Sequence, residues 1–186
     1  MMDKEVLIIT DEKIISTHDN YEVMHRWEDP LMKLKAEWVC QDGGDILELG
    51  FGMGISATYI QQHNINSHTI CEINPQILEK LHIWAKDKPN VIILEGGWYP
   101  NVPQMKTYNG ILFDTHKDPT HQYFRQVVSN ICKPNCKITW WNNTSDEWDE
   151  LKLEGEVDYE IIDVNPPLNK YFNHKKYYMP KYIYNA

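Results

Sequence analysis

The chain has 186 residues, enough for one domain that buries about 70% of the surface of its unfolded form. Its 27 acidic residues outnumber its 18 Lys and Arg residues, which gives a formal net charge of −9. This negative field repels phosphate backbones, so it excludes tight nucleic-acid binding through a basic surface and favours a cationic substrate. The four cysteines form no C-x-x-C pair, and no segment has the pattern of a signal peptide or a membrane span. We therefore expect a cytoplasmic protein with no nucleic-acid or membrane partner.

The start of the chain predicts β-structure ahead of a first helix. Residues 5–16 hold two β-rich runs around a polar turn, which predicts a hairpin. Residues 18–30 form a polar stretch, and apolar residues then recur at helical spacing over residues 31–39. We interpret residues 1–27 as a hairpin and cover segment and residues 28–186 as a single domain.

Beyond that helix, strand and helix patterns alternate along the chain. The predicted strands are 46–49, 69–73, 91–94, 110–113 and 137–141, the helices between them are 55–62, 76–86 and 120–132, and further β-rich runs cover 157–164 and 175–184. Residues 96–100 are expected to be a loop, the acidic residues 146–150 a solvated helix face, and Tyr123 an inward-facing side chain. The alternation predicts an α/β fold with a Rossmann-like sheet that is mostly parallel and has a C-terminal antiparallel hairpin at one edge.

The segment DILELGFGMG, residues 45–54, has the layout of a nucleotide-cofactor loop. An apolar strand runs into Gly50, Gly52 and Gly54, which let the backbone turn sharply and pass close to a ligand. Glu48 precedes these glycines within the strand. A second acidic residue, Glu72, ends the next strand about twenty positions on, where it is placed to bind ribose hydroxyls.

The glycine spacing separates two classes of cofactor. A dinucleotide loop of the G-x-G-x-x-G type needs a third glycine at the position of Ile55. The E-L-G-x-G-x-G form is instead similar to the first motif of class I S-adenosylmethionine-dependent methyltransferases. A glycine-rich turn in some other α/β protein stays open as the alternative.

Several polar residues follow the ends of the predicted strands. Ligands of such sheets lie outside the carboxyl ends of the strands, so the glycine loop, Glu72, Gly97, Asp114 and residues 142–145 should converge on one crevice.

Asp114 and Glu28 are the two carboxylates that stand in unusual surroundings. Asp114 follows three apolar residues at a buried strand end, where a carboxylate without a partner costs several kcal/mol, which favours a functional role. Glu28, just before the first helix, is either functional or a carboxylate favoured by the helix dipole.

Seven segments together resemble guanidinoacetate N-methyltransferase and its relative, the fungal protein arginine Nδ-methyltransferase. They are VMHRWEDPLM, ELGFGMG, EINP, EGGW, ILFDT, WNNTS and YYMP, and the likeness runs from Val23 to Ile183. The resemblance implies a class I methyltransferase domain over residues 28–186 with S-adenosylmethionine as its cofactor. It implies cofactor contacts at Met24, Trp27, Gly50, Met53, Glu72, Gly97, Trp98 and Thr115, to which we add Glu48, Gly52, Gly54, Ile73 and Asp114.

The resemblance also implies that Glu28 and Asp114 hold a guanidinium, and that Asn143 and Thr144 hold a substrate carboxylate through their backbone. The chemistry agrees, because a guanidinium presents five donors in a planar fork and two carboxylates can each accept a pair of them. The guanidinium nitrogen has no free lone pair, since the pKa of the group is above about 12. A carboxylate that accepts its proton as the methyl arrives restores its nucleophilicity, and we predict Asp114 for that role.

The substrate remains open among guanidinoacetate, arginine, another small guanidine and a protein arginine. The ankyrin repeats of the fungal relative are absent from the sequence, which favours a small guanidine. The segment 144–156 leaves little room for the long helix of the animal enzymes. We expect no metal, because the spacing of His116, Asp118 and His121 is not that of a tetrahedral site.

Two alternatives lie outside this interpretation. A nicotinamide-dependent oxidoreductase would use the same crevice, but the chain lacks the third glycine and an evident acid for hydride transfer. A non-catalytic S-adenosylmethionine-binding protein would have no need of Glu28 together with Asp114.

Overall fold

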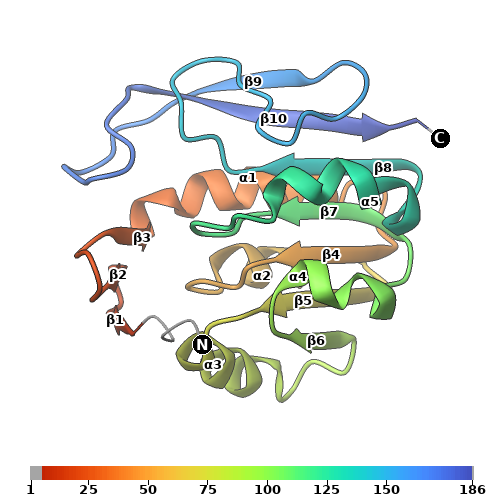
Figure 1. Cartoon of the computed structure of the whole chain (residues 1–186), viewed down its shortest axis with the longest axis horizontal. Coiled ribbons are helices and arrows are strands. Elements are labelled where there is room, and N and C mark those ends of the chain that lie inside the picture. Colours follow the sequence, from red (N-terminus) through yellow and green to blue (C-terminus); the bar gives the residue numbers. More distant parts are fainter. Residues whose placement is uncertain (1–5, 186) are drawn as a thin grey trace.

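The computed structural model describes residues 6–185 and contains a seven-stranded sheet. This sheet lies at the centre of the molecule in Figure 1. The strand order is β6-β5-β4-β7-β8-β10-β9. The strands are β4 (Asp45–Leu49), β5 (Ser67–Glu72), β6 (Val91–Glu95), β7 (Tyr108–Phe113), β8 (Cys132–Trp140), β9 (Asp158–Asp163) and β10 (Lys176–Tyr184). Neighbours from β6 to β8 pair in parallel, whereas β10 pairs antiparallel with both β8 and β9. The predicted mostly parallel sheet with a C-terminal antiparallel hairpin is therefore confirmed.

Helices cover both faces of this sheet. They are α1 (Asp29–Val39), α2 (Ile55–Ile60), α3 (Pro75–Ala85), α4 (Trp98–Asn101) and α5 (Phe124–Ile131), with short 3-10 turns η1 (Arg26–Glu28), η2 (Val102–Gln104) and η3 (His121–Tyr123). Alternation along β4 divides the core, because Ile46 packs with residues of α1 and α2 while Leu47 packs with residues of α5. None of the described helices is long and apolar enough to cross a bilayer.

The start of the described chain forms a second, three-stranded sheet of β1 (Leu7–Ile9), β2 (Lys13–Ser16) and β3 (Glu22–His25). The predicted hairpin is confirmed, since Leu7 pairs with Ser16. The polar stretch 18–30, for which no strand was predicted, contains β3, whose Met24 is buried against the glycine loop. Gln76 of α3 ties the sheet to the domain through two hydrogen bonds with the backbone of Leu7, at 2.8 and 3.1 Å.

Local structure differs from the prediction at three further places. The expected loop 96–100 contains the start of α4, whose Asn101 donates hydrogen bonds to the carbonyls of Glu95 and Gly97. Residues 146–150 form no helix, and the side chain of Asn142 donates to the carbonyl of Asp146 at the start of this segment. Tyr123 was expected to face inward but is 37% exposed, since it lies in η3 ahead of α5.

Candidate active site

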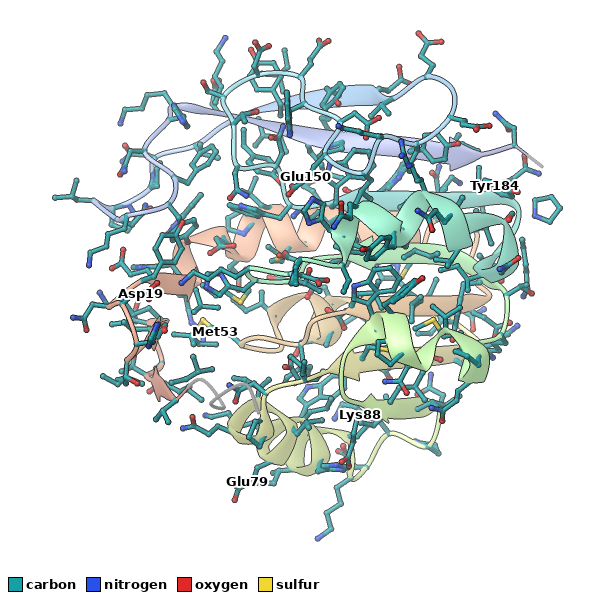
Figure 2. The ribbon with its side chains drawn as sticks, viewed as in Figure 1. Asp19, Met53, Glu79, Lys88, Glu150 and Tyr184 are labelled. Atoms are coloured by element: carbon teal, nitrogen blue, oxygen red, sulfur yellow. The ribbon has the colours of Figure 1, made fainter. Side chains whose placement is uncertain are left out.

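A cavity of about 510 Å³ opens where the carboxyl ends of β4, β7 and β8 meet the N-terminal sheet. Seven of the predicted site residues line it: Met24, Glu28, Gly50, Gly52, Asp114, Thr115 and Asn143. Glu150 also lines it and comes from the irregular segment before β9, above the central strands in Figure 2. The predicted convergence of strand ends on one crevice therefore holds for β4, β7 and β8.

The glycine loop owes its path to conformations that side chains disfavour. Gly50 has φ 93° and Gly52 has φ 54°, both in the left-handed region. A Cβ on Gly50 would overlap the backbone carbonyl of Asp114, and one on Gly52 would lie 2.7 Å from the sulfur of Met24. The loop thus passes between the end of β7 and β3, and its two glycines leave the backbone accessible from the cavity. Gly54 then precedes α2 as its N-cap residue.

Glu72 anchors the loop to the end of β5. Its carboxylate accepts hydrogen bonds from the backbone N–H groups of Phe51 at 3.0 Å, Ile73 at 2.8 Å and Asn74 at 2.7 Å. Ile73 is 70% exposed, and a Cβ on Gly97 would lie 3.8 Å from it. The exposed side chain of Ile73 beside Gly97, which has no side chain, could pack against a flat aromatic base. These residues could therefore hold the adenosine of S-adenosylmethionine.

Two residues that were predicted to contact the cofactor lie in the core. Glu48 is fully buried, where it accepts a hydrogen bond from the hydroxyl of Ser56 and pairs with His68 Nε2 at 3.0 Å. Trp98 is 3% exposed, and its indole N–H donates to Asp118 at 2.6 Å. The polar groups of Glu48 and Trp98 form hydrogen bonds with other protein residues rather than facing the cavity. Glu48 thus stabilises the strand that leads into the glycine loop, and Trp98 stabilises the segment after β7.

Trp27, Met53 and Thr144 also lie outside the cavity lining. The indole of Trp27 donates to the hydroxyl of Tyr171 at 3.0 Å. The backbone N–H of Thr144 donates to the side chain of Asn142 at 3.0 Å, and is thus engaged within the turn. Met53, labelled in Figure 2 on the side of the N-terminal sheet, donates its backbone N–H to the sulfur of Met24 at 3.4 Å.

Glu28 and Asp114, which we call the acid pair, both line the cavity. Glu28 ends η1 and is 3% exposed, and its Oε1 accepts hydrogen bonds from the backbone N–H of His25 at 2.8 Å and from the hydroxyl of Tyr171. Burial and the neighbouring charge of Asp114 raise the pKa of Glu28 to about 8. Asp114 follows β7 with its side chain 26% exposed, and removal from water raises its pKa as well. Two carboxylates that resist ionisation thus face one cavity.

Lys35 lies beside the acid pair, although it was not among the predicted site residues. It lies on α1 with its side chain fully buried, and its Nζ is 3.6 Å from Asp114 Oδ2. The ammonium lies 4.7 Å from the centre of the Trp141 ring and 5.5 Å from that of Tyr177. Burial lowers the pKa of Lys35, while the charges of Asp114 and Glu28 oppose that change. The sequence did contain a signal for this buried lysine, because Lys35 stands four positions after Leu31 and therefore on the apolar face of the helix.

Asp118 and Tyr171 are two more residues that sequence reasoning missed. Asp118 accepts hydrogen bonds from the hydroxyl of Thr115 at 3.1 Å and the backbone N–H of Thr120 at 2.8 Å. Tyr171 belongs to an irregular segment before β10, and its contact with Glu28 joins residues far apart in the chain. Within residues 6–185 no group of three or more His, Cys, Asp or Glu side chains is arranged to hold a metal ion.

The architecture defines a class I methyltransferase fold, with a glycine loop after β4, an acidic residue at the end of β5 and an antiparallel edge formed by β10 and β9. A spermidine synthase from Thermotoga maritima shares the fold, with a TM-score of 0.67 at 10% identity over 96% of this chain and 72% of that chain. The model of the guanidinoacetate N-methyltransferase family matches residues 12–154, and the chain belongs to that family.

Two relatives are named protein arginine N-methyltransferase 2. The protein from Candida glabrata is 30% identical over 92% of this chain and 50% of its own length. The protein from Yarrowia lipolytica is 31% identical over 87% of this chain and 40% of its own length. The chain therefore spans half or less of these curated relatives.

Proposed function

We propose that this chain is an S-adenosylmethionine-dependent N-methyltransferase that acts on a guanidino group. The observation that carries the proposal is that Glu28 and Asp114 face the same cavity as Gly50 and Gly52. Two carboxylates that could bind a cation thus line the same cavity as the glycine loop. Neither a hydride-transfer enzyme nor a non-catalytic cofactor-binding protein requires such a pair of carboxylates.

The cofactor would lie along the glycine loop. Gly50 and Gly52 offer a backbone without side chains, Glu72 would accept hydrogen bonds from the ribose hydroxyls, and Ile73 with Gly97 would cover the base. S-adenosylmethionine supplies an electrophilic methyl group on a sulfonium. Thr115 and Met24 line the same cavity as this loop and the two acids, so they would also contact the cofactor.

Glu28 and Asp114 would bind and activate the guanidinium. Each carboxylate can accept paired N–H groups from the planar fork, with about 1.5–3 kcal/mol for each charge-assisted hydrogen bond. Asp114 lies against Gly50 and is thus the acid nearer the cofactor. S-adenosylmethionine would supply the methyl and be left as S-adenosylhomocysteine, and the carboxylate of Asp114 would take the proton of the nitrogen that gains the methyl. Alignment of the two partners can supply about 7–11 kcal/mol of the barrier.

A small guanidine such as guanidinoacetate or arginine is the first candidate substrate, with its carboxylate toward the backbone of Asn143. A protein arginine is the second, and it is favoured by the names of the relatives. We further infer a cytoplasmic location, for which the support is that Cys40, Cys71, Cys132 and Cys136 are all free thiols.

Mass spectrometry of the products tests the proposal. The protein is incubated with S-adenosylmethionine and, in separate reactions, guanidinoacetate, arginine, other small guanidines and an arginine-containing peptide. A methyl gained by a small guanidine supports the first candidate, and a methyl gained by the peptide alone supports the second. If the cofactor binds but no guanidine gains a methyl, the proposed function is wrong.

A further inference from the structure

Lys35 is a buried cation that packing alone does not explain. Its side chain is fully buried, and among the described residues its ammonium has no hydrogen-bond partner. Leaving a charged group dehydrated and without hydrogen bonds is costly, and an apolar side chain of similar length would fill the same space without that cost. Lys35 does not line the cavity, so any contribution to a ligand must pass through a neighbour.

The neighbours of Lys35 come from four separate elements of the fold. Asp114 follows β7, Glu28 ends η1, Trp141 follows β8 and Tyr177 lies in β10. Further charges act on the same groups, since Glu48 of β4 disfavours the ionised form of Asp114 and Tyr171 donates a hydrogen bond to Glu28. Within residues 6–185, the opposite charge that pairs with Asp114 is Lys35, at 3.6 Å.

We propose that Lys35 is a positioning residue for the guanidino site, whose ammonium holds Asp114 ionised beside Glu28 so that Asp114 can accept a proton from the substrate. This role rests on the proposed function. Without Lys35, the repulsion between Glu28 and Asp114 in a dehydrated site would favour protonation of Asp114. A protonated Asp114 could not accept the proton of the substrate. With Lys35, the two carboxylates and one ammonium sum to −1 when all are ionised, which a single guanidinium neutralises.

The test compares Lys35→Met with Lys33→Met, a matched change on the same helix. Lys33 is 55% exposed and has its Nζ 3.9 Å from Glu37, so its loss should not reach the cavity. Met has nearly the length of the lysine stem and suits a buried site. Lys35→Gln is the second variant, to be measured if Lys35→Met does not fold.

Carbon-13 NMR of labelled Asp side-chain carboxyls gives a readout that needs no turnover. The signal of Asp114 is identified by its loss in Asp114→Asn. Removal of an opposite charge at this range should raise the proton affinity of Asp114 about tenfold or more in Lys35→Met, while Lys33→Met leaves it unchanged. A titration of Asp114 that is the same in wild type and Lys35→Met overturns the role of Lys35.

The pH profile of kcat, which reports the substrate complex in which Glu28 is already ionised, then connects this charge to catalysis. In Lys35→Met the acid limb should move to higher pH by about one pH unit or more, as a merely structural lysine would not cause. An unmoved acid limb in a folded, active variant contradicts the role of Lys35. If the wild type methylates no guanidine, the proposed function fails, and the NMR titration still decides whether Lys35 holds Asp114 ionised.

Discussion

Two buried carboxylates, Glu72 and Glu28, differ in how their negative charge is stabilised. At the proposed cofactor end, Glu72 is 8% exposed and accepts three backbone N–H groups, so its charge is matched by fixed dipoles. At the proposed substrate end, Glu28 is 3% exposed, accepts one backbone N–H and one hydroxyl, and faces Asp114. The cofactor end is complete without a ligand, whereas the substrate end holds acids that a cation would neutralise. Variants at each end should therefore fail differently.

The largest effect is expected at Asp114. In Asp114→Asn the amide keeps the shape of the side chain but cannot take a proton, so kcat should fall about 10²–10⁴-fold. Affinity for S-adenosylmethionine, measured by calorimetry, should stay within a few fold because Gly50 contacts the backbone of this residue. A variant with the wild-type turnover would contradict the role of Asp114 as proton acceptor.

Glu28 should act on binding more than on turnover. Glu28→Gln keeps acceptors for the His25 N–H and the Tyr171 hydroxyl but loses the charge toward the guanidinium. Loss of about 1.5–3 kcal/mol of charge-assisted hydrogen bonding corresponds to a rise in KM of about 10- to 150-fold. Steady-state kinetics on the substrate found by mass spectrometry measure it. A fall in kcat with an unchanged KM would assign Glu28 to the chemical step instead.

The pH dependence of KM follows from the same carboxyl. Because the pKa of Glu28 is raised to about 8, the free site is mostly protonated at neutral pH and must release a proton to bind a cation. KM should therefore fall about tenfold for each pH unit up to about pH 8 and level off above it. Calorimetry in two buffers of different ionisation enthalpy should show proton release at pH 7. A KM that is flat from about pH 6 to pH 8 would rule out this ionisation.

The smallest effect in this series concerns the backbone of the cofactor end. Gly50→Ala should lower the melting temperature by about 2–12 °C, because φ 93° is strained for alanine and the new Cβ meets the carbonyl of Asp114. Gly97→Ala is the control for folding, since Gly97 has φ −62° and its Cβ would lie 3.5 Å from Pro100. Equal melting temperatures for the two variants would show that the conformation of Gly50 carries no special constraint.

Local patterns predicted most of the central sheet because each strand and helix there has its own signal. Asn74 and Pro75 mark the start of α3, where the Asn74 side chain accepts from the backbone of Gln76. β3 gave a weaker signal, because its short run mixes polar and apolar residues and is held by contacts with β2 and the glycine loop. The irregular segment 146–150 is likewise contacted from outside, since the Asn142 side chain donates to the carbonyl of Asp146.

By itself the sequence determined the order of strands and helices, the glycine loop and the two acids, because periodicity, glycine spacing and strand ends are written within short segments. Tertiary structure alone decided which polar residues face the cavity. It placed Glu48 and Trp98 in the core, beside His68 and Asp118, and it brought Lys35 to Asp114 across 79 positions. Such pairings depend on the packing of α1 and β7, and the dehydration that changes the charge of these groups exists only once those elements meet.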